Sequence, residues 1–369
     1  MRVAYFIGSL NRGGTETLVL DTFRRRDVAP FECILIYRND GDLTEEYRAT
    51  GVSMFRNKPH GSKLGYIRKL RGLLKRERVD ILHTQTLLNA FLGLFCVCFS
   101  HTKLVASFHG FFPSFKDRLL SHFVIWFADA SVFVSKYVCK WYLRNTFFAS
   151  KQRCHVVYNG VDFSKFDIKY PCPEFLENRA SVSIGQHLNL AMVGSFVSGR
   201  SQLFICQCLK RLHDNGEKGF HFFFVGKHSK AEPELYDDCI KFCRDNGLLN
   251  RIHFLGGRED VPAILQHIDG FVYASVNDTF GIAVIEAIAS GVPVLVNDWD
   301  VMCEITSNGG LADLYKSHDV EDCVTKLQKL IANNHDYKAH AVVKAGVARR
   351  KYSIEKHIQS LFQVYQKVV

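Results

Sequence analysis

The sequence predicts an α/β protein with two doubly wound domains, each a parallel sheet covered by helices on both faces. Three observations support this prediction. Short apolar runs rich in Val, Ile and Phe alternate with helical patterns along most of the chain. The alternation pauses once, after Val157, and then resumes. The chain has 369 residues, and this length favours two domains over one.

The predicted strands form two groups. The first group is Val3–Ile7, Cys33–Tyr37, Val52–Phe55, Ile81–Thr84, Leu104–Phe108, Ser131–Val134 and His155–Val157, and the second is Leu188–Val193, Phe222–Val225, Ile252–Leu255, Gly270–Tyr273 and Val292–Val296. Because repeated βα units give parallel strands, we expect ligands to bind at the carboxyl ends of these strands.

A proline-containing segment separates the two groups. Asn159-Gly160 is a turn signal, and Pro171 and Pro173 follow it in a stretch of mixed polar residues. The predicted boundaries are therefore a first domain at 1–165, a linker at 166–187 and a second domain at 188–350. The remaining residues, 351–369, are predicted to be a C-terminal helix.

Composition and charge narrow the class of partner. Hydrophobic content of 47% and charged content of 23% are typical of a soluble globular protein. Residues 1–180 hold 27 Lys and Arg against 16 Asp and Glu, whereas the rest holds 20 against 21. Within this basic half, residues 58–78 have the pattern of a basic amphipathic helix. One interpretation is that this helix binds anionic lipid or a diphosphate-bearing acceptor. The other is that it is a solvated surface helix whose leucines enter the core. Without a nucleic-acid motif, no nucleic-acid partner is expected.

Cysteine spacing and hydropathy point to the cytoplasm. None of the 12 cysteines forms a CxxC pair, so neither a zinc ribbon nor a thioredoxin-like site is predicted. The chain opens on a strand pattern without a signal peptide. Its longest clean apolar run, Ala90 to Phe99, is far shorter than the ~20 residues of a spanning helix. The aromatic-rich stretch 108–148 could dip into a membrane surface without crossing it.

The segment from Asp278 to Val296 carries the most chemical information. It places two carboxylates, Asp278 and Glu286, on either side of Phe280-Gly281. Ile282 to Ser290 is predicted to be a buried helix ended by Gly291. The unpaired amides at such a helix start favour a phosphate, and the carboxylates can accept hydrogen bonds from sugar hydroxyls. The segment therefore favours a nucleotide sugar.

This segment resembles the acidic-x7-Glu signature of retaining GT-B glycosyltransferases of family 4, the glycosyl transferases group 1 type. That family usually has Glu at the first position, where this chain has Asp278. Further motifs near residues 13, 109, 159, 200 and 256 stand in the family's order. The resemblance covers nearly the whole chain and implies the GT-B fold, with two Rossmann-like domains facing a cleft and a terminal helix crossing back to the first domain.

The resemblance implies roles for residues of the first half. Gly13 and Gly14 belong to a glycine loop after the first strand, near the donor phosphates and the acceptor. His109, after the strand Leu104–Phe108, would be an active-site residue that hydrogen-bonds the donor sugar or polarises the reacting centre. His83, in the sequence DILHTQT, is a second candidate at the end of a strand.

In the second half, Arg200 stands where the family has a Lys that binds the donor diphosphate, and Ser195 stands where the family has an Arg. Arg is a good phosphate partner because its guanidinium binds bidentately. The predicted donor-binding residues are Gly13, Gly14, Arg200, Gly226, Arg258, Phe280, Gly281 and Ile282. The predicted catalytic residues are His109, Asp278, which would fix the donor sugar, and Glu286, which would accept from ribose hydroxyls.

The implied activity is transfer of a sugar from a UDP or GDP sugar to an acceptor hydroxyl with retention, without a metal or cofactor. The implied acceptor is a lipid-linked oligosaccharide of bacterial surface polysaccharide synthesis, such as O-antigen, and the implied location is the cytoplasm, peripheral on the inner face of the membrane. Two alternatives stay open. A GT-B sugar-nucleotide 2-epimerase would share both domains, and the departures at Asp278 and Ser195 also fit a catalytically decayed sugar-nucleotide-binding protein.

Overall fold

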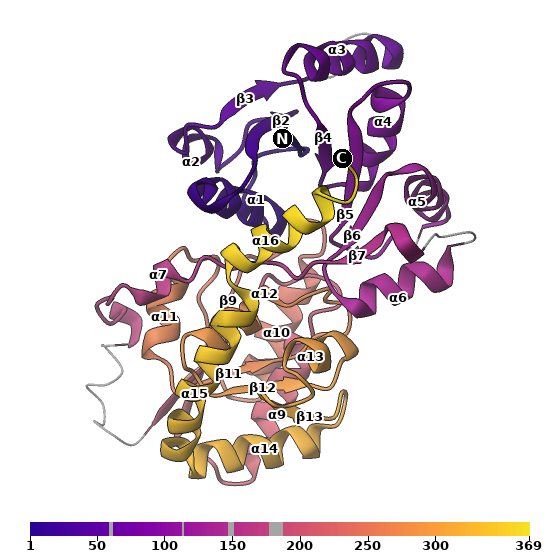
Figure 1. Ribbon diagram of the computed structural model, residues 1–369. Helices are drawn as coiled ribbons and strands as arrows, with labels where there is room; N and C mark the ends of the chain where they lie inside the picture. Colours follow the sequence, from indigo (N-terminus) through magenta and orange to yellow (C-terminus); the bar gives the residue numbers. More distant parts are fainter. Residues whose placement is uncertain (59–61, 113, 147–150, 177–186) are drawn as a thin grey trace. The chain divides into compact units, whose positions relative to one another are not determined.

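The computed structural model describes residues 1–58, 62–112, 114–146, 151–176 and 187–369. The chain divides into two compact units: Met1–Asp162 with Tyr352–Val369, and Phe163–Lys351. Each unit is a parallel sheet with helices on both faces, which confirms the predicted α/β class (Figure 1). Part of the predicted linker, residues 177–186, lies outside the described residues.

Unit 1 contains a seven-stranded parallel sheet in the order β3-β2-β1-β4-β5-β6-β7. Its elements are β1 (Arg2–Phe6), α1 (Gly14–Arg24), η1 (Arg26–Val28), β2 (Glu32–Tyr37), α2 (Thr44–Ala49), β3 (Ser53–Arg56), α3 (Lys63–Arg76), β4 (Ile81–Thr84), α4 (Leu87–Val97), β5 (Lys103–Phe108), α5 (Phe115–Phe127), β6 (Ala130–Phe133), α6 (Lys136–Asn145), η2 (Lys151–Arg153), β7 (Cys154–Val156) and α16 (Ile354–Tyr365). In register, Tyr5 of β1 pairs with Leu35 of β2 on one side and with His83 of β4 on the other.

The C-terminal helix α16 completes the core of unit 1. Its apolar residues Ile354, Ile358 and Leu361 are at most 1% exposed and join Val3 and Tyr5 of β1 in one hydrophobic cluster. Burial of this stripe removes apolar surface from water, which is the main force that holds the helix on the sheet.

The basic helix predicted at 58–78 is α3. Leu70 and Leu74 are buried in the core, whereas Arg68 and Lys69 are exposed, so the helix has one apolar and one charged face. Among the described residues, no helix combines the length and the hydropathy needed to cross a bilayer.

Unit 2 contains a six-stranded parallel sheet in the order β10-β9-β8-β11-β12-β13. Its elements include α7 (Ser164–Asp167), β8 (Leu188–Val193), α9 (Gln202–Asp214), β9 (Phe220–Val225), α10 (Glu234–Asp245), β10 (Ile252–Phe254), α11 (Val261–His267), β11 (Gly270–Tyr273), α12 (Ile282–Ala289), β12 (Val294–Asn297), α13 (Asp300–Ile305), β13 (Asp313–Tyr315), α14 (Val320–Ala332) and α15 (Asn334–Tyr352). The central position of β8 and β11 brings their following loops to the same edge of the sheet.

One strand was not predicted from the sequence. The edge strand β13 is only three residues long and, of the strands in the described segments, pairs with β12 alone, with Leu314 opposite Val296. A run of three residues that begins with Asp313 shows no periodicity, so its strand conformation depends on the neighbouring strand.

Candidate functional site

The site in unit 2 begins where the loops after β8 and β9 meet. A Cβ atom added to Gly226 would lie 2.0 Å from the carbonyl oxygen of Gly194, so only glycine permits this approach of the two backbones. The amide of Gly194 donates to Val225 O at 2.8 Å, and the amide of Gly226 donates to Gly256 O at 2.8 Å. Three glycines therefore stand side by side at the carboxyl ends of β8, β9 and β10.

A second glycine contact carries Arg200 to the loop after β11. Gly199 has a φ of 88°, and a Cβ there would lie 2.4 Å from Asn277 Cβ. The backbone carbonyl of Gly199 accepts from Val276 N at 2.8 Å, and the amide of Ser201 donates to Ala274 O at 3.2 Å. These bonds tie the loop after β8 to the loop after β11 and place Arg200 beside Asp278.

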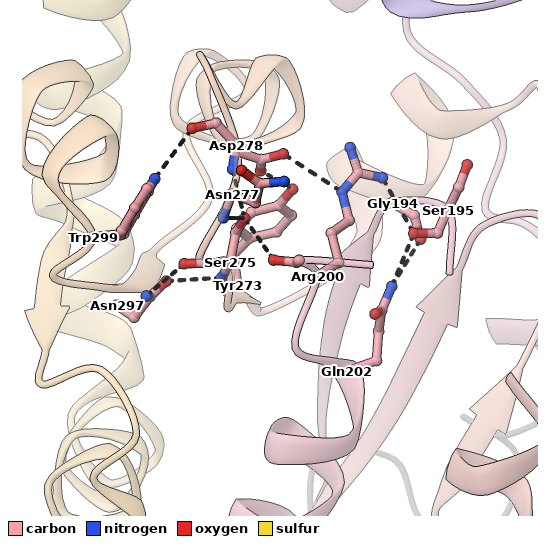
Figure 2. Close-up of polar contacts among 11 residues, drawn as sticks. Gly194, Ser195, Arg200, Gln202, Tyr273, Ser275, Asn277, Asp278, Asn297 and Trp299 are labelled. Carbon is pink, nitrogen blue, oxygen red and sulfur yellow. Dashed lines mark hydrogen bonds and ion pairs between the residues drawn. The ribbon is translucent and has the colours of Figure 1, made fainter. Parts of the chain in front are cut away.

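Arg200 and Asp278 form a half-buried ion pair (Figure 2). Nε of Arg200 lies 3.8 Å from Oδ1 of Asp278, and the two side chains are 26% and 16% exposed. Within the described part of the chain, the Nε–H group has no hydrogen-bond acceptor. A buried charged donor without an acceptor is costly, so Arg200 is suited to bind a further anion.

Tyr273 holds the other oxygen of the same carboxylate. Its hydroxyl donates to Asp278 Oδ2 at 2.5 Å (Figure 2). Burial raises the pKa of Tyr273 far above its ordinary value, so the phenol stays protonated and remains a donor. Tyr273 belongs to the buried strand β11. Sequence reasoning did not identify it, because in an apolar strand pattern a Tyr looks like any other buried residue and the direction of its hydroxyl cannot be predicted.

Asn297 and Trp299 fix the backbone of this loop. The amide side chain of Asn297 accepts from Ser275 N at 3.0 Å and donates to Ser275 O at 2.8 Å. The indole Nε1 of Trp299 donates to the carbonyl oxygen of Asp278 at 3.1 Å (Figure 2). Sequence reasoning missed both residues, although a buried Asn at the carboxyl end of β12 is a detectable polar signal.

The helix α12 begins directly after this cluster. Gly281 is its N-cap, with a left-handed φ of 82°, and no side chain of the described residues caps the helix. The first amides of an α-helix have no acceptor within the helix, so this end can bind an anion. The predicted contact at Phe280 is restricted to its backbone, because the Phe280 side chain is 2% exposed and belongs to the core.

Glu286 lies one turn into the same helix and is paired with a residue that sequence reasoning missed. Nζ of Lys165, on α7, is 3.8 Å from Glu286 Oε1, and the Glu286 side chain is 17% exposed. The pair neutralises a carboxylate that is largely removed from water. Arg258, by contrast, is engaged at the surface, with bonds of 2.8 Å and 2.6 Å to the carboxylate of Asp260, so its predicted donor contact stays a prediction.

Unit 1 places His109 beside Gln85. The ring Nε2 of His109 donates to Gln85 Oε1 at 2.8 Å. Burial, with a smaller contribution from His357, lowers the pKa of His109 to about 4. The imidazole is therefore neutral at pH 7 and can act as a hydrogen-bond partner, not as a cation.

His83 has a structural position. It lies within β4, is 1% exposed, and has Nδ1 2.6 Å from the Tyr365 hydroxyl and Nε2 2.7 Å from Ser107 Oγ. Both ring nitrogens are satisfied by neighbours within unit 1, so the hypothesis of a strand-end ligand is wrong for this residue.

The glycine loop of unit 1 carries a carboxylate. Gly13 is the N-cap of α1, and a Cβ there would lie 2.6 Å from Glu16 Oε2. Burial raises the pKa of Glu16. Because this acid lies against the loop, sugar hydroxyls are better partners here than a phosphate.

Comparison with known proteins decides the family. The pattern of Glycosyltransferase Family 4 matches residues 12–165, and that of Glycosyl transferases group 1 matches residues 187–333. The chain belongs to the family 4 glycosyltransferases of the GT-B fold. The resemblance found in the sequence is thereby confirmed.

Individual relatives agree with this assignment. The chain is 24% identical over 332 residues to the UDP-Gal:alpha-D-GlcNAc-diphosphoundecaprenol alpha-1,3-galactosyltransferase of Escherichia coli, covering 86% of this chain and 84% of the relative. It is 23% identical to the N,N'-diacetylbacillosaminyl-diphospho-undecaprenol alpha-1,3-N-acetylgalactosaminyltransferase of Campylobacter jejuni, over 66% and 61% of the two chains. The structure of Anabaena Alr3699/HepE in complex with UDP and glucose has the same fold, with a TM-score of 0.84, 18% identity and 98% of each chain covered.

In this glycosyltransferase, Ser195 contributes its backbone where the family has an Arg side chain. Its carbonyl oxygen accepts from Nη1 of Arg200 at 3.3 Å and from Nε2 of Gln202 at 3.1 Å (Figure 2). The loop therefore supports Arg200 and does not add a second cation at this position.

Proposed function

We propose that this glycosyltransferase moves a sugar from a nucleoside-diphosphate sugar to a hydroxyl of a lipid-linked oligosaccharide, with retention and without a metal ion. The observation that supports it most is the ion pair of Arg200 and Asp278 next to the uncapped start of α12, with Glu286 on the same helix. A cation and unpaired helix amides can bind a diphosphate, and the two carboxylates can accept hydrogen bonds from the hydroxyls of a sugar and a ribose.

Arg200 and the first amides of α12 would bind the diphosphate. As the bond between the anomeric carbon and the phosphate oxygen breaks, negative charge grows on the departing diphosphate. The acceptor oxygen bonds to the anomeric carbon, and its proton passes to an oxygen of the departing diphosphate. Fixed donors at this position stabilise that charge without reorganising at the moment of reaction. The orphaned Nε–H of Arg200 supplies one such donor.

Asp278 would bind the transferred sugar of the donor, and Glu286 would bind its ribose. A carboxylate offers about four lone-pair sites, so Asp278 can keep its bond from Tyr273 and still accept from a hydroxyl of the transferred sugar. Glu286, held by Lys165, would accept from the ribose hydroxyls. In unit 1, neutral His109 donates from Nε2 to Gln85, so its other ring nitrogen would accept a hydrogen bond from a hydroxyl of the donor sugar.

The donor and acceptor classes are inferred from the relatives. Alr3699/HepE is described in complex with UDP, and the names of the Escherichia coli and Campylobacter jejuni relatives specify undecaprenol-linked acceptors. We infer a uridine-diphosphate sugar and a polyprenyl-diphosphate oligosaccharide, with the protein peripheral on the cytoplasmic face of the membrane. The epimerase alternative is not favoured, because these relatives are transferases by name.

The test is an assay with a panel of UDP and GDP sugars and an undecaprenyl-diphosphate-linked sugar acceptor. Nucleotide release that requires the acceptor, with an α-linked product from an α-linked donor by NMR, supports the proposal. Release or epimerised nucleotide sugar without acceptor supports the epimerase, and turnover of none of the donors supports the decayed binder.

A further inference from the structure

Exposed aromatic side chains gather on one part of unit 1. Among the described residues, every Phe, Tyr or Trp that is exposed lies on α4, on α5 or just after α4. We call these residues the aromatic patch: Phe95 (50% exposed), Phe99 (97%), Phe115 (83%), Phe123 (43%), Trp126 (51%) and Phe127 (59%). A concentration of this kind on a soluble domain marks an interaction surface.

Ring contacts join four of the six patch residues, Phe95, Phe123, Trp126 and Phe127, through Phe91. Phe91 of α4 contacts Phe95 at 5.3 Å and Phe123 of α5 at 6.4 Å between ring centroids. Along α5, Phe123 stacks with Phe127 at 6.4 Å, and Trp126 stacks with Phe127 at 5.5 Å. The two helices pack side by side in unit 1 (Figure 1).

The helix α5 has two apolar faces. Phe115, Leu119, Phe123 and Phe127 recur every four residues and are all exposed, whereas Val124 and its neighbours on the other face are buried. The neighbouring helix α4, with the sequence LLNAFLGLFCV, has no charged residue. An ordinary surface helix turns polar residues to water, so this outward apolar face requires a partner.

Basic groups border the patch. Nη2 of Arg71, on α3, donates to the carbonyl oxygen of Phe99 at 3.3 Å, and Nη1 of Arg153 donates to that of Trp126 at 3.1 Å. Lys116 and Arg118 are exposed on α5 itself. The one acid of α5, Asp117, is hydrogen-bonded to Ser114 at the start of the helix.

We propose that the aromatic patch inserts into the interface of an anionic lipid bilayer, with its rings at the acyl boundary and the basic groups at the lipid phosphates. Phe and Trp next to Lys and Arg are the residues that anchor proteins in this zone. A second copy of the chain is a poorer occupant, because a twofold contact would bring like-charged borders together. The inference rests on the proposed membrane-linked acceptor and names the surface that would face the membrane.

Trp126 permits a direct test with the full chain. It is exposed, whereas the other two tryptophans, Trp141 and Trp299, are half-buried. With vesicles of phosphatidylcholine and phosphatidylglycerol that contain brominated lipid, we expect quenching of the Trp126 fluorescence. The variant Trp126→Phe should still bind the vesicles and lose most of the quenching.

Substitution of the most exposed rings tests the insertion. The variant Phe99→Ser/Phe115→Ser/Phe127→Ser should lower vesicle partitioning at least about tenfold, because hydrophobic transfer energy scales with the apolar area buried. Val342→Ser/Val343→Ser is the matched control, since these residues are 67% and 71% exposed on α15 in unit 2, and it should bind like the wild type. Reversal of charge in Lys116→Glu/Arg118→Glu should remove the preference for anionic over neutral vesicles.

Equal partitioning of the ring variant and the wild type would overturn the proposal. So would sedimentation equilibrium that shows a wild-type dimer which the ring variant splits into monomers. The vesicle experiments use neither donor nor acceptor. A negative result in them would therefore contradict the membrane surface without contradicting the proposed sugar transfer, which the transfer assay tests separately.

Discussion

The Tyr273 hydroxyl donates a 2.5 Å hydrogen bond to Asp278 Oδ2, across the turn between β11 and α12. The opposite oxygen of the same carboxylate faces Arg200 Nε at 3.8 Å. The acid at the first position of the family signature is therefore held from both sides, although its side chain is one carbon shorter than the usual Glu. Its orientation is fixed before a ligand binds, which is the condition for strong electrostatic effects in a site.

Tyr273→Phe removes one hydroxyl and keeps the buried ring. We expect kcat/KM for the donor to fall about tenfold, because the half-buried Asp278 loses a hydrogen bond from a fixed donor. Steady-state kinetics with varied donor measure this. Tyr315→Phe is the matched control, since its buried hydroxyl bonds to Tyr273 O at 2.8 Å and not to Asp278. An equal loss in both variants would assign the effect to packing in β11 and not to the carboxylate.

Arg200→Lys introduces the residue that the family has at this position. We expect it to keep a substantial part of the transferase activity. Arg200→Ala should lower kcat/KM for the donor about a hundredfold, because it removes the charge that we propose binds the diphosphate. Arg211→Ala is a suitable control, because Arg211 forms an exposed pair with Glu321 on the same unit. Wild-type donor kinetics for Arg200→Ala would remove Arg200 from the site.

Glu286→Ala should abolish transfer, because we propose that this carboxylate binds the ribose of the donor. The fold should stay intact, because the neighbours Ile285 and Ala287 supply the buried face of α12. Transfer assays and circular dichroism on the same preparation separate the two effects. If the variant transfers sugar at a near-normal rate, Glu286 does not contact the donor.

Acid should destabilise unit 1. Burial lowers the pKa of His109 and His357 to about 4 and holds the pKa of His83 well below its usual value. Between pH 6.5 and about 4 the unfolded chain binds protons that the folded protein excludes. As the pH is lowered through this range, the free energy of unfolding therefore decreases by about 1.4 kcal/mol per pH unit for each such His. Above pH 6.5 these groups contribute no pH dependence.

Urea unfolding at several pH values measures this slope. His357→Gln should make it shallower, whereas His335→Gln should not change it, because the His335 side chain is 98% exposed. A slope that is the same in His357→Gln and the wild type would exclude His357 as a source of the acid sensitivity.

The sequence predicted the strands well because buried parallel strands are short apolar runs, and β8 was predicted with its observed bounds, Leu188–Val193. The edge strand β13 was missed because three residues carry no pattern. Within the site, the order of motifs pointed to Arg200, but not to its contact with Asp278, which depends on the bonds of Gly199 to the next loop. Tyr273 was missed because it has the apolar pattern of a strand.

His83 shows the opposite error. A histidine near the end of a strand suggested a ligand, yet its two nitrogens face Tyr365 and Ser107 inside the core of unit 1. The partner Tyr365 comes from α16, which is 282 positions further along the chain, so local sequence could not show that this imidazole was already satisfied.

The most direct test of the central claim is calorimetric titration of the full chain with UDP, compared with GDP and ADP. The account predicts that the wild type binds UDP, and that Arg200→Ala weakens this binding about a hundredfold while Arg211→Ala does not. Absence of binding to any of the three nucleotides, or UDP binding that Arg200→Ala leaves unchanged, would contradict a diphosphate site at Arg200 and the start of α12.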